Sequence, residues 1–150
     1  MGSIRILIAD DFEGWRRQVC LLFQVRAEWK IIAEARDGLE AIQRAEERKP
    51  DLILLDIGLP KLNGIEAARR IRQLSPRSRI IFLSLYDSLD EVQVALSTGA
   101  MGYVLKTDSL RELVPAVDAV LLGKQFVSSS LKGFEYTDRL SARSGVAFSE

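Results

Sequence analysis

The sequence contains no histidine and only one cysteine. Without histidine, the chain has no Ser-His pair for nucleophilic catalysis, no imidazole metal ligand and no histidine-based pH switch. Because Cys20 has no second cysteine to pair with, an internal disulfide is excluded. Any chemistry must therefore come from carboxylates, hydroxyls, amines and backbone groups.

The sequence also lacks a net charge and a long apolar run. Its 21 basic residues balance 21 acidic ones, so no overall attraction to nucleic acid or to an anionic membrane is expected. No apolar run approaches the roughly 20 residues that span a bilayer, and the N-terminus shows no signal-peptide pattern. With 47% hydrophobic and 28% charged residues in 150, the composition predicts one soluble, cytoplasmic, globular domain.

Strand-like and helix-like segments alternate up to residue 123. Short apolar runs predict strands at 4–9, 29–33, 52–55, 79–83 and 103–105, and helical spacing of apolar residues predicts helices at about 13–26, 39–49, 65–74, 89–97 and 108–121. This alternation predicts an α/β fold: a doubly wound, five-stranded parallel sheet with five helices. We expect a domain at 3–123 and a poorly ordered extension or linker at 124–150.

Acidic side chains follow two of the predicted strands. Asp56 ends the apolar run 52–55, and the pair Asp10-Asp11 ends the first strand. Parallel sheets bind their ligands at the carboxyl ends of the strands, so neighbouring strands would bring these three acids into one pocket. Their mutual repulsion would be costly without a cation. Oxygen ligands of this kind suit a hard divalent metal such as Mg²⁺.

Two further strand ends carry polar groups, Ser84 and Lys106. Taken singly, an aspartate here is most often a turn former or helix cap, a serine a turn residue and a lysine a solvated side chain. Taken together, these groups suit phosphoryl transfer, which depends mainly on positioning and charge stabilisation. Asp56 would present an oxygen to the donor, Lys106 a mobile positive charge and Ser84 a hydroxyl for the new phosphoryl oxygens.

The order and spacing of these residues resemble a response-regulator receiver domain, the CheY-like fold of two-component signalling, in the NarL/FixJ/LuxR style. The resemblance spans about residues 3–123 and rests on Asp10-Asp11, the segment from Asp56 to Gly64, Leu83-Ser84 and the segment from Gly99 to Lys106. It implies that a histidine kinase phosphorylates Asp56. It also implies a Mg²⁺ site made of Asp10, Asp11, Asp56 and the backbone carbonyl of Gly58.

The resemblance implies a switch as well. Ser84 and Lys106 would contact the phosphoryl group, and Tyr103 falls on the aromatic position that turns inward when the serine moves. An ordinary half-buried strand aromatic is the plainer interpretation of Tyr103. The chain departs from many receivers in having Thr107, rather than proline, after Lys106. Gly58 and Tyr86 occupy two variable positions that resemble the family's modulators of phosphate lifetime.

Other functions are compatible with parts of the pattern. A Mg²⁺-dependent phosphohydrolase also uses a nucleophilic aspartate. Such enzymes carry a DxD motif directly after the first strand, whereas here Asp10 and Asp11 are adjacent and the isolated Asp56 follows the third strand. A flavodoxin-like nucleotide binder would need a phosphate loop where Asp10-Asp11-Phe12-Glu13 is acidic. A pseudo-receiver that binds proteins without phosphorylation is a further alternative.

The expected partners are a histidine kinase, a downstream protein or an effector domain absent from this chain, and a second copy of the chain after phosphorylation. We expect no turnover enzyme, no membrane contact and no direct DNA binding, since residues 124–150 show no pair of helices that could enter a groove.

Overall fold

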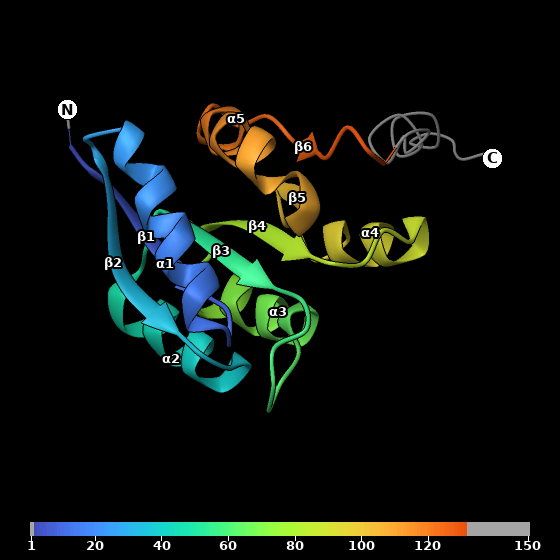
Figure 1. Ribbon diagram of the computed structural model, residues 1–150. Helices are drawn as coiled ribbons and strands as arrows, with labels where there is room; N and C mark the ends of the chain where they lie inside the picture. Colours follow the sequence, from blue (N-terminus) through green and yellow to red (C-terminus); the bar gives the residue numbers. More distant parts are fainter. Residues whose placement is uncertain (1, 132–150) are drawn as a thin grey trace.

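The computed structural model describes residues 2–131 (Figure 1). The strands are β1 (Ile4–Ala9), β2 (Trp29–Ala35), β3 (Leu52–Asp56), β4 (Arg79–Ser84), β5 (Gly102–Leu105) and β6 (Phe126–Val127). The helices are α1 (Glu13–Leu22), α2 (Gly38–Arg48), α3 (Gly64–Leu74), α4 (Leu89–Leu96) and α5 (Ser109–Leu121), with short 3-10 turns η1 (Phe23–Val25) and η2 (Lys106–Asp108).

The strands form one parallel sheet in the order β2-β1-β3-β4-β5-β6. The chain runs outward in one direction from β1 to β2 and then returns to place β3 on the other side of β1. The strand order therefore reverses between β1 and β3. In open sheets of this class, ligands bind at the carboxyl ends of the strands beside such a reversal. The topology thus directs attention to the residues that follow β1 and β3.

Helices cover both faces of the sheet (Figure 1). Alternate strand residues face opposite sides, so Ile6 and Leu54 pack under α1 and α5, while Leu7 and Ile53 pack under α2, α3 and α4. Because both faces are covered, the central strands read as continuous apolar runs, and all five residues of β3 are buried. These two cores confirm the predicted α/β fold.

Polar side chains define where three of the helices begin. Asp37, Asn63 and Ser88 cap α2, α3 and α4, each accepting a hydrogen bond from the N–H three residues later, at 2.8, 3.0 and 3.4 Å. At α2 the contact is reciprocal, since the Glu40 carboxylate accepts from the N–H of Arg36 at 2.8 Å. Such caps satisfy N–H groups that the first helical turn leaves unpaired.

A short sixth strand was not predicted. Phe126 and Val127 of β6 pair with Gly102 and Tyr103 of β5, and Leu131 packs into the core on the α4 side. Residues 124–131 of the expected extension therefore lie against the domain. The rest of that extension, residues 132–150, falls outside the described residues.

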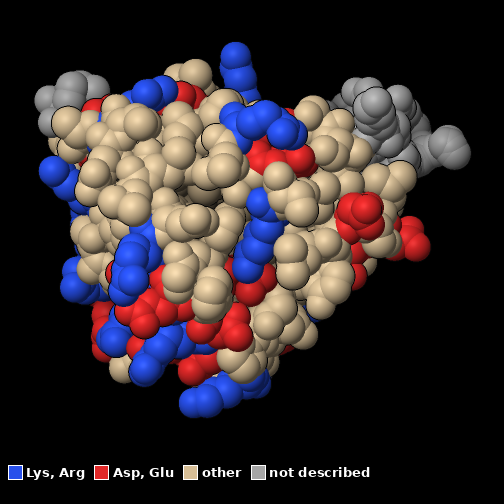
Figure 2. Space-filling view, viewed as in Figure 1, with Lys and Arg blue, Asp and Glu red and all other residues tan. Residues whose placement is uncertain are grey.

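The described surface is mixed in charge. On the face shown in Figure 2, basic and acidic side chains lie among one another rather than in one large patch of a single sign. Among the described helices, none combines the length and the apolar character needed to cross a bilayer.

Two loops at the carboxyl edge of the sheet touch at backbone level. The N–H of Gly38, the first residue of α2, donates to the carbonyl of Pro60 at 3.2 Å, and Lys61 Nζ lies 3.5 Å from Asp37 Oδ2. A Cβ atom on Gly38 would lie 1.9 Å from the backbone oxygen of Leu62. Only glycine fits this contact, which fixes the loop that follows β3.

We expect Gly38→Ala to lower the free energy of unfolding by about 1–3 kcal/mol, since the added methyl must displace backbone. Gly14→Ala is the matched control near the start of α1. There the added Cβ would meet only the flexible ring of exposed Phe12, so helix propensity should make the change neutral or mildly stabilising. Chemical denaturation of both variants measures the difference. Equal stabilities would show that the loop contact at Gly38 is loose.

Candidate functional site

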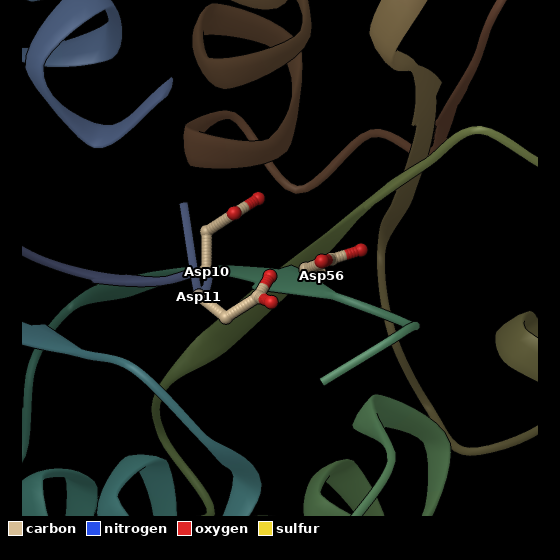
Figure 3. Close-up of side chains that lie close together, drawn as sticks. All are labelled: Asp10, Asp11 and Asp56. Atoms are coloured by element: carbon tan, nitrogen blue, oxygen red, sulfur yellow. The ribbon is translucent and has the colours of Figure 1, made fainter. Parts of the chain in front are cut away.

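The strand ends beside the reversal bring three carboxylates together. Asp10 directly follows β1, Asp56 ends β3, and one carboxylate oxygen from each of Asp10, Asp11 and Asp56 lies within 4.8 Å of the others (Figure 3). Asp10 is fully buried and Asp56 is 8% exposed, whereas Asp11 faces solvent. The predicted convergence of the three acids therefore holds in the structure.

Lys106 is the cation that faces these acids. It begins η2, directly after β5, and its Nζ lies 2.6 Å from Asp10 Oδ2 and 3.5 Å from Asp56 Oδ2. The same Nζ lies 5.3 Å from the centre of the Trp15 ring, a distance at which an ammonium is attracted to the ring face. Three carboxylates still outnumber one ammonium. The remaining negative charge and the clustered oxygens fit a hard divalent cation.

Backbone groups hold the two buried carboxylates in place. The N–H of Phe12 donates to Asp10 Oδ1 at 2.9 Å, and the N–H of Gly58 donates to Asp56 Oδ1 at 3.1 Å. A Cβ atom on Gly64 would lie 2.2 Å from the backbone oxygen of Asp56, so α3 begins in direct contact with the end of β3. The direction of the Asp56 side chain is thus set by main-chain geometry on both sides.

The environment of Asp56 disfavours its charged form. Burial raises the pKa of the Asp56 carboxyl above its ordinary value; Lys106 opposes the shift, and the charge of Asp10 adds to it. Asp37, in the neighbouring loop, shows the opposite behaviour. The hydrogen bond from the N–H of Glu40 lowers the pKa of Asp37 below its ordinary value, and Lys61 reinforces that shift.

A cavity of about 440 Å³ opens over the acids. Its polar wall is made of Asp10, Asp11, Asp56 and Lys106, and its other lining residues are Phe12, Trp15, Gly58, Leu85 and Tyr86. A larger cavity of about 770 Å³ lies at the amino ends of the strands and is lined by none of the predicted site residues. The smaller cavity is the candidate site because the reactive groups face it.

Ser84 and Tyr103 meet beside this cavity without lining it. Ser84 is fully buried, and its Oγ accepts a hydrogen bond from the N–H of Tyr86 at 2.9 Å. The Tyr103 ring is also fully buried, and its hydroxyl donates to the carbonyl of Tyr86 at 2.8 Å. Burial raises the pKa of Tyr103 to about 12, although a hydrogen bond with Ser84 acts against that shift. The two predicted switch residues are therefore joined through one loop residue.

Two residues of α1 at this site were not predicted to have a role in it. Trp15 lies within the helix predicted at about 13–26; it lines the cavity, and its ring faces the Lys106 ammonium. Arg16 was not singled out, yet it is buried and hydrogen-bonded to the backbone of Asp10. An Arg-Arg pair at the start of a helix resembles a solvated surface, so composition alone carried no signal for Arg16.

Comparisons with known proteins give a consistent picture. A family profile described as the response regulator receiver domain matches residues 6–118. The transcriptional regulatory protein DegU of Brevibacillus brevis is 36% identical over 126 residues, which are 84% of this chain and 53% of that protein. The transcriptional regulatory protein LnrK of Bacillus subtilis is 38% identical over 80% of this chain and 54% of its own length. The chain thus spans about half the length of these relatives.

Solved structures show the same architecture. A two-component response regulator of the LuxR family from Aurantimonas sp. SI85-9A1 superimposes with a TM-score of 0.84 at 32% identity, covering 93% of this chain and 99% of that one. The signal receiver domain of the response regulator NarL from Mycobacterium tuberculosis gives a TM-score of 0.77 at 28% identity, covering 83% of this chain and all of that one. The matches extend over the strands and helices that carry the site.

We expect Asp56→Asn to stabilise the protein when metal is removed by a chelator. Since the native pKa of Asp56 is raised, the native state binds a proton more tightly than the unfolded chain does. The stability of the native state therefore falls as pH rises from the unfolded-state pKa to the native-state pKa of Asp56. The gain from the neutral amide should therefore grow as pH rises above the ordinary aspartate pKa of about 4. Thermal unfolding across this range provides the measurement.

Asp37→Asn is the contrasting variant, because the native pKa of Asp37 is lowered and its charge is favourable. Its melting temperature should fall below that of the unsubstituted protein at neutral pH. A stabilised Asp37→Asn, or an Asp56→Asn variant that is destabilised without metal, would contradict the electrostatic account of the site.

Proposed function

The chain belongs to the response regulator receiver domain family, and from this premise we propose that it is a phosphoacceptor of two-component signalling. The phosphoryl group would pass from a histidine kinase to Asp56. The observation that carries this proposal is the convergence of Asp56 with Lys106 and the acid pair Asp10-Asp11 in one cavity. The chain would accept phosphate on its own side chain rather than turn over a substrate.

Asp56 would form the new bond to phosphorus, and Lys106 and Ser84 would contact the transferred group. A carboxylate oxygen of Asp56 forms a bond to phosphorus as the bond between phosphorus and the kinase imidazole breaks, and the imidazole keeps the electron pair and regains a proton from solvent. Lys106 lies 3.5 Å from Asp56 Oδ2, close enough to contact the transferred oxygens. Ser84 would donate its hydroxyl to the same group after leaving the N–H of Tyr86. These contacts supply positioning and charge stabilisation.

Asp10, Asp11, Asp56 and the carbonyl of Gly58 would hold a divalent cation. When bound, Mg²⁺ supplies positive charge beside the carboxylates and the phosphoryl oxygens. The fit is supported by three carboxylate oxygens within 4.8 Å of one another, set against a single ammonium group.

We further propose that phosphorylation is read out on the surface formed by α4, β5 and α5. A phosphoryl group adds roughly −1.5 to −2 charges, which would draw Ser84 and Lys106 toward Asp56 and release space beside Tyr103. The loop between β4 and α4 contains Tyr86, which is hydrogen-bonded to both Ser84 and Tyr103. This loop and α4 expose the apolar side chains of Leu85, Tyr86, Leu89 and Val94. Their partner would be a downstream protein, a second copy or an effector domain, in the cytoplasm.

Direct reading of DNA is assigned to such a partner rather than to this chain. The chain spans about half the length of the regulators it matches, and basic and acidic residues are interspersed on the face in Figure 2. Sequence-specific binding needs an element that enters a groove. The expectation that residues 124–150 contain no such element concerns a stretch described only to residue 131.

We expect a small phosphodonor and Mg²⁺ to add one acid-labile phosphoryl group, and Asp56→Asn to abolish that addition. Intact-mass spectrometry measures both. The matched control is Asp51→Asn, at the opposite end of β3, where the side chain accepts from the N–H of Arg5. The control should label as the unsubstituted protein does. Undiminished labelling of Asp56→Asn would refute Asp56 as the acceptor.

We expect Mg²⁺ to raise the melting temperature before any phosphorylation. A ligand that binds only the native state adds about 2.7 kcal/mol of stability at a hundredfold excess over its Kd. Asp11→Ala should remove most of this increase, whereas Glu13→Ala should retain it, because Glu13 is an exposed acid paired with Arg17. A melting temperature that ignores millimolar Mg²⁺ would argue against the cation site.

A further inference from the structure

Arg16 is a buried charge beside the acid pair. Its side chain is 10% exposed, whereas that of the next residue in α1, Arg17, is 69% exposed. Arginine is almost never buried unless its charge is paired. The contacts of Arg16 therefore indicate what the burial achieves.

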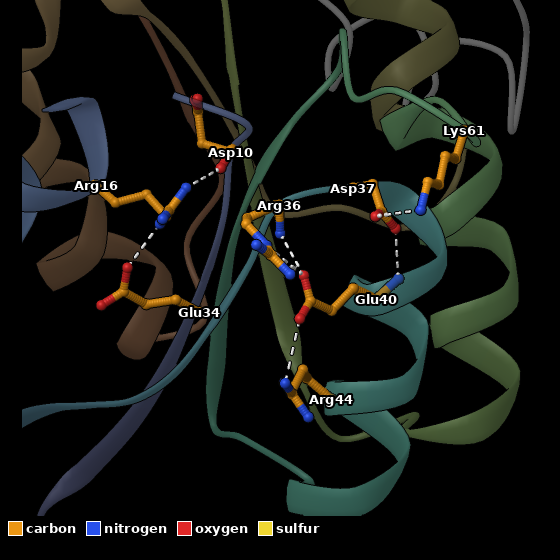
Figure 4. A network of polar contacts seen from close by, with 8 residues as sticks. All are labelled: Asp10, Arg16, Glu34, Arg36, Asp37, Glu40, Arg44 and Lys61. Carbon is orange, nitrogen blue, oxygen red and sulfur yellow. Dashed lines mark hydrogen bonds and ion pairs between the residues drawn. The ribbon is translucent and has the colours of Figure 1, made fainter. Parts of the chain in front are cut away.

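The guanidinium of Arg16 is held between two partners. Its Nη1 donates to the backbone carbonyl of Asp10 at 2.7 Å, and its Nε donates to Glu34 Oε1 at 2.6 Å (Figure 4). The fork geometry of arginine fixes these two directions at once, which a lysine ammonium would not do. Arg16 thus joins α1 to the end of β1 and to β2.

The carbonyl that Arg16 binds belongs to the peptide bond between Asp10 and Asp11. The other polar groups of Asp10 are already bonded: its N–H donates to the carbonyl of Ala35 at 2.9 Å, and its carboxylate has the partners described above. Because Asp10 is fully buried, its carbonyl needs a partner inside the protein. Arg16 fills that place and so sets the plane from which both acidic side chains project.

An irregularity in β2 brings Glu34 to Arg16. Ile6 of β1 pairs with Ile31, but Leu7 pairs with Ala33, so Ile32 is an extra residue in β2. A bulge of this kind moves every later side chain to the opposite face.

The packing records this change of face. Trp29 and Ile31 pack on the α1 and α5 side, whereas Ala33 and Ala35 pack on the α2 side. Glu34 consequently pairs with Ile8, whose side chain lies on the α1 side. Without the extra residue, Glu34 would face away from Arg16.

We propose that Arg16, held by Glu34, is a positioning residue for the divalent-cation site: it fixes the Asp10–Asp11 peptide so that both carboxylates face the same ion. The inference rests on the proposed function, since it assigns a task to Arg16 within that site. Arg16 itself would not contact the cation. Groups that orient metal ligands in this way typically contribute about tenfold to a hundredfold in affinity.

The sign of the effect separates positioning from simple electrostatics. Arg16 carries a positive charge near the site, so electrostatic repulsion alone predicts that Arg16→Gln binds Mg²⁺ more tightly. A tie that only joins α1 to β2 predicts lower stability but unchanged affinity in the folded protein. Positioning predicts weaker binding despite the lost positive charge.

The experiment is calorimetric titration of the unphosphorylated protein with Mg²⁺. We expect Arg16→Gln to bind about tenfold to a hundredfold more weakly, and the matched control Arg17→Gln to stay within about twofold of the unsubstituted protein, because Arg17 is exposed and pairs only with Glu13 among the described residues. In phosphorylation assays of Arg16→Gln, the Mg²⁺ concentration for half-maximal rate should rise while the rate at saturating Mg²⁺ is retained.

Equal or tighter Mg²⁺ binding by folded Arg16→Gln would overturn the proposal. If that variant does not fold, Arg16→Lys decides, since it keeps the charge but cannot hold both partners: weaker binding supports positioning and unchanged binding refutes it. Should the unsubstituted protein bind no Mg²⁺, the cation site of the proposed function and this inference fall together. If the unsubstituted protein binds Mg²⁺ and the Arg16 variants bind it equally well, the inference alone fails.

Discussion

The mutual repulsion of Asp10, Asp11 and Asp56 is the constraint on which the site depends. Carboxylates within 4.8 Å of one another, two of them buried, repel strongly because little water is present to screen them. The surrounding groups answer this repulsion with the ammonium of Lys106 and backbone N–H donors. The pKa of Asp56 is nevertheless raised, mainly because the carboxyl is buried, with a further contribution from the charge of Asp10. The excess negative charge favours a positively charged ligand in this pocket.

The sheet makes this arrangement affordable because the acids rest on main chain rather than on mobile loops. Asp10 and Asp56 stand at the ends of hydrogen-bonded neighbours, β1 and β3, and glycine contacts lock the loop that follows β3. Lys106 follows β5, and its long side chain reaches Asp10 past the ends of both β4, which ends in the small Ser84, and β3. The acids are thus placed by the strand ends, whereas the lysine ammonium is placed by a long side chain that pairs with two of them.

Periodicity and strand ends predicted the sheet, both cores and the meeting of Asp56 with Lys106, because these depend on local patterns. The bulge at Ile32 could not be predicted, since one extra residue leaves an apolar run unchanged in composition while it reverses the faces beyond it. Arg16 was missed for the same reason: its partner Glu34 reaches it only through that reversal. The two residues of β6 are too few to form a pattern, and their pairing with β5 is a tertiary effect.

The hydrogen bonds around β6 also determine how far a disturbance must travel. Ser128 accepts from the N–H of Leu105 through its hydroxyl at 2.8 Å and donates its own N–H to the carbonyl of Tyr103 at 3.0 Å. Leu105 directly precedes Lys106. Ser128, directly after β6, is therefore hydrogen-bonded to the end of β5, which Lys106 follows. A displacement of the Lys106 backbone would therefore reach Ser128 through a single intervening residue, Leu105.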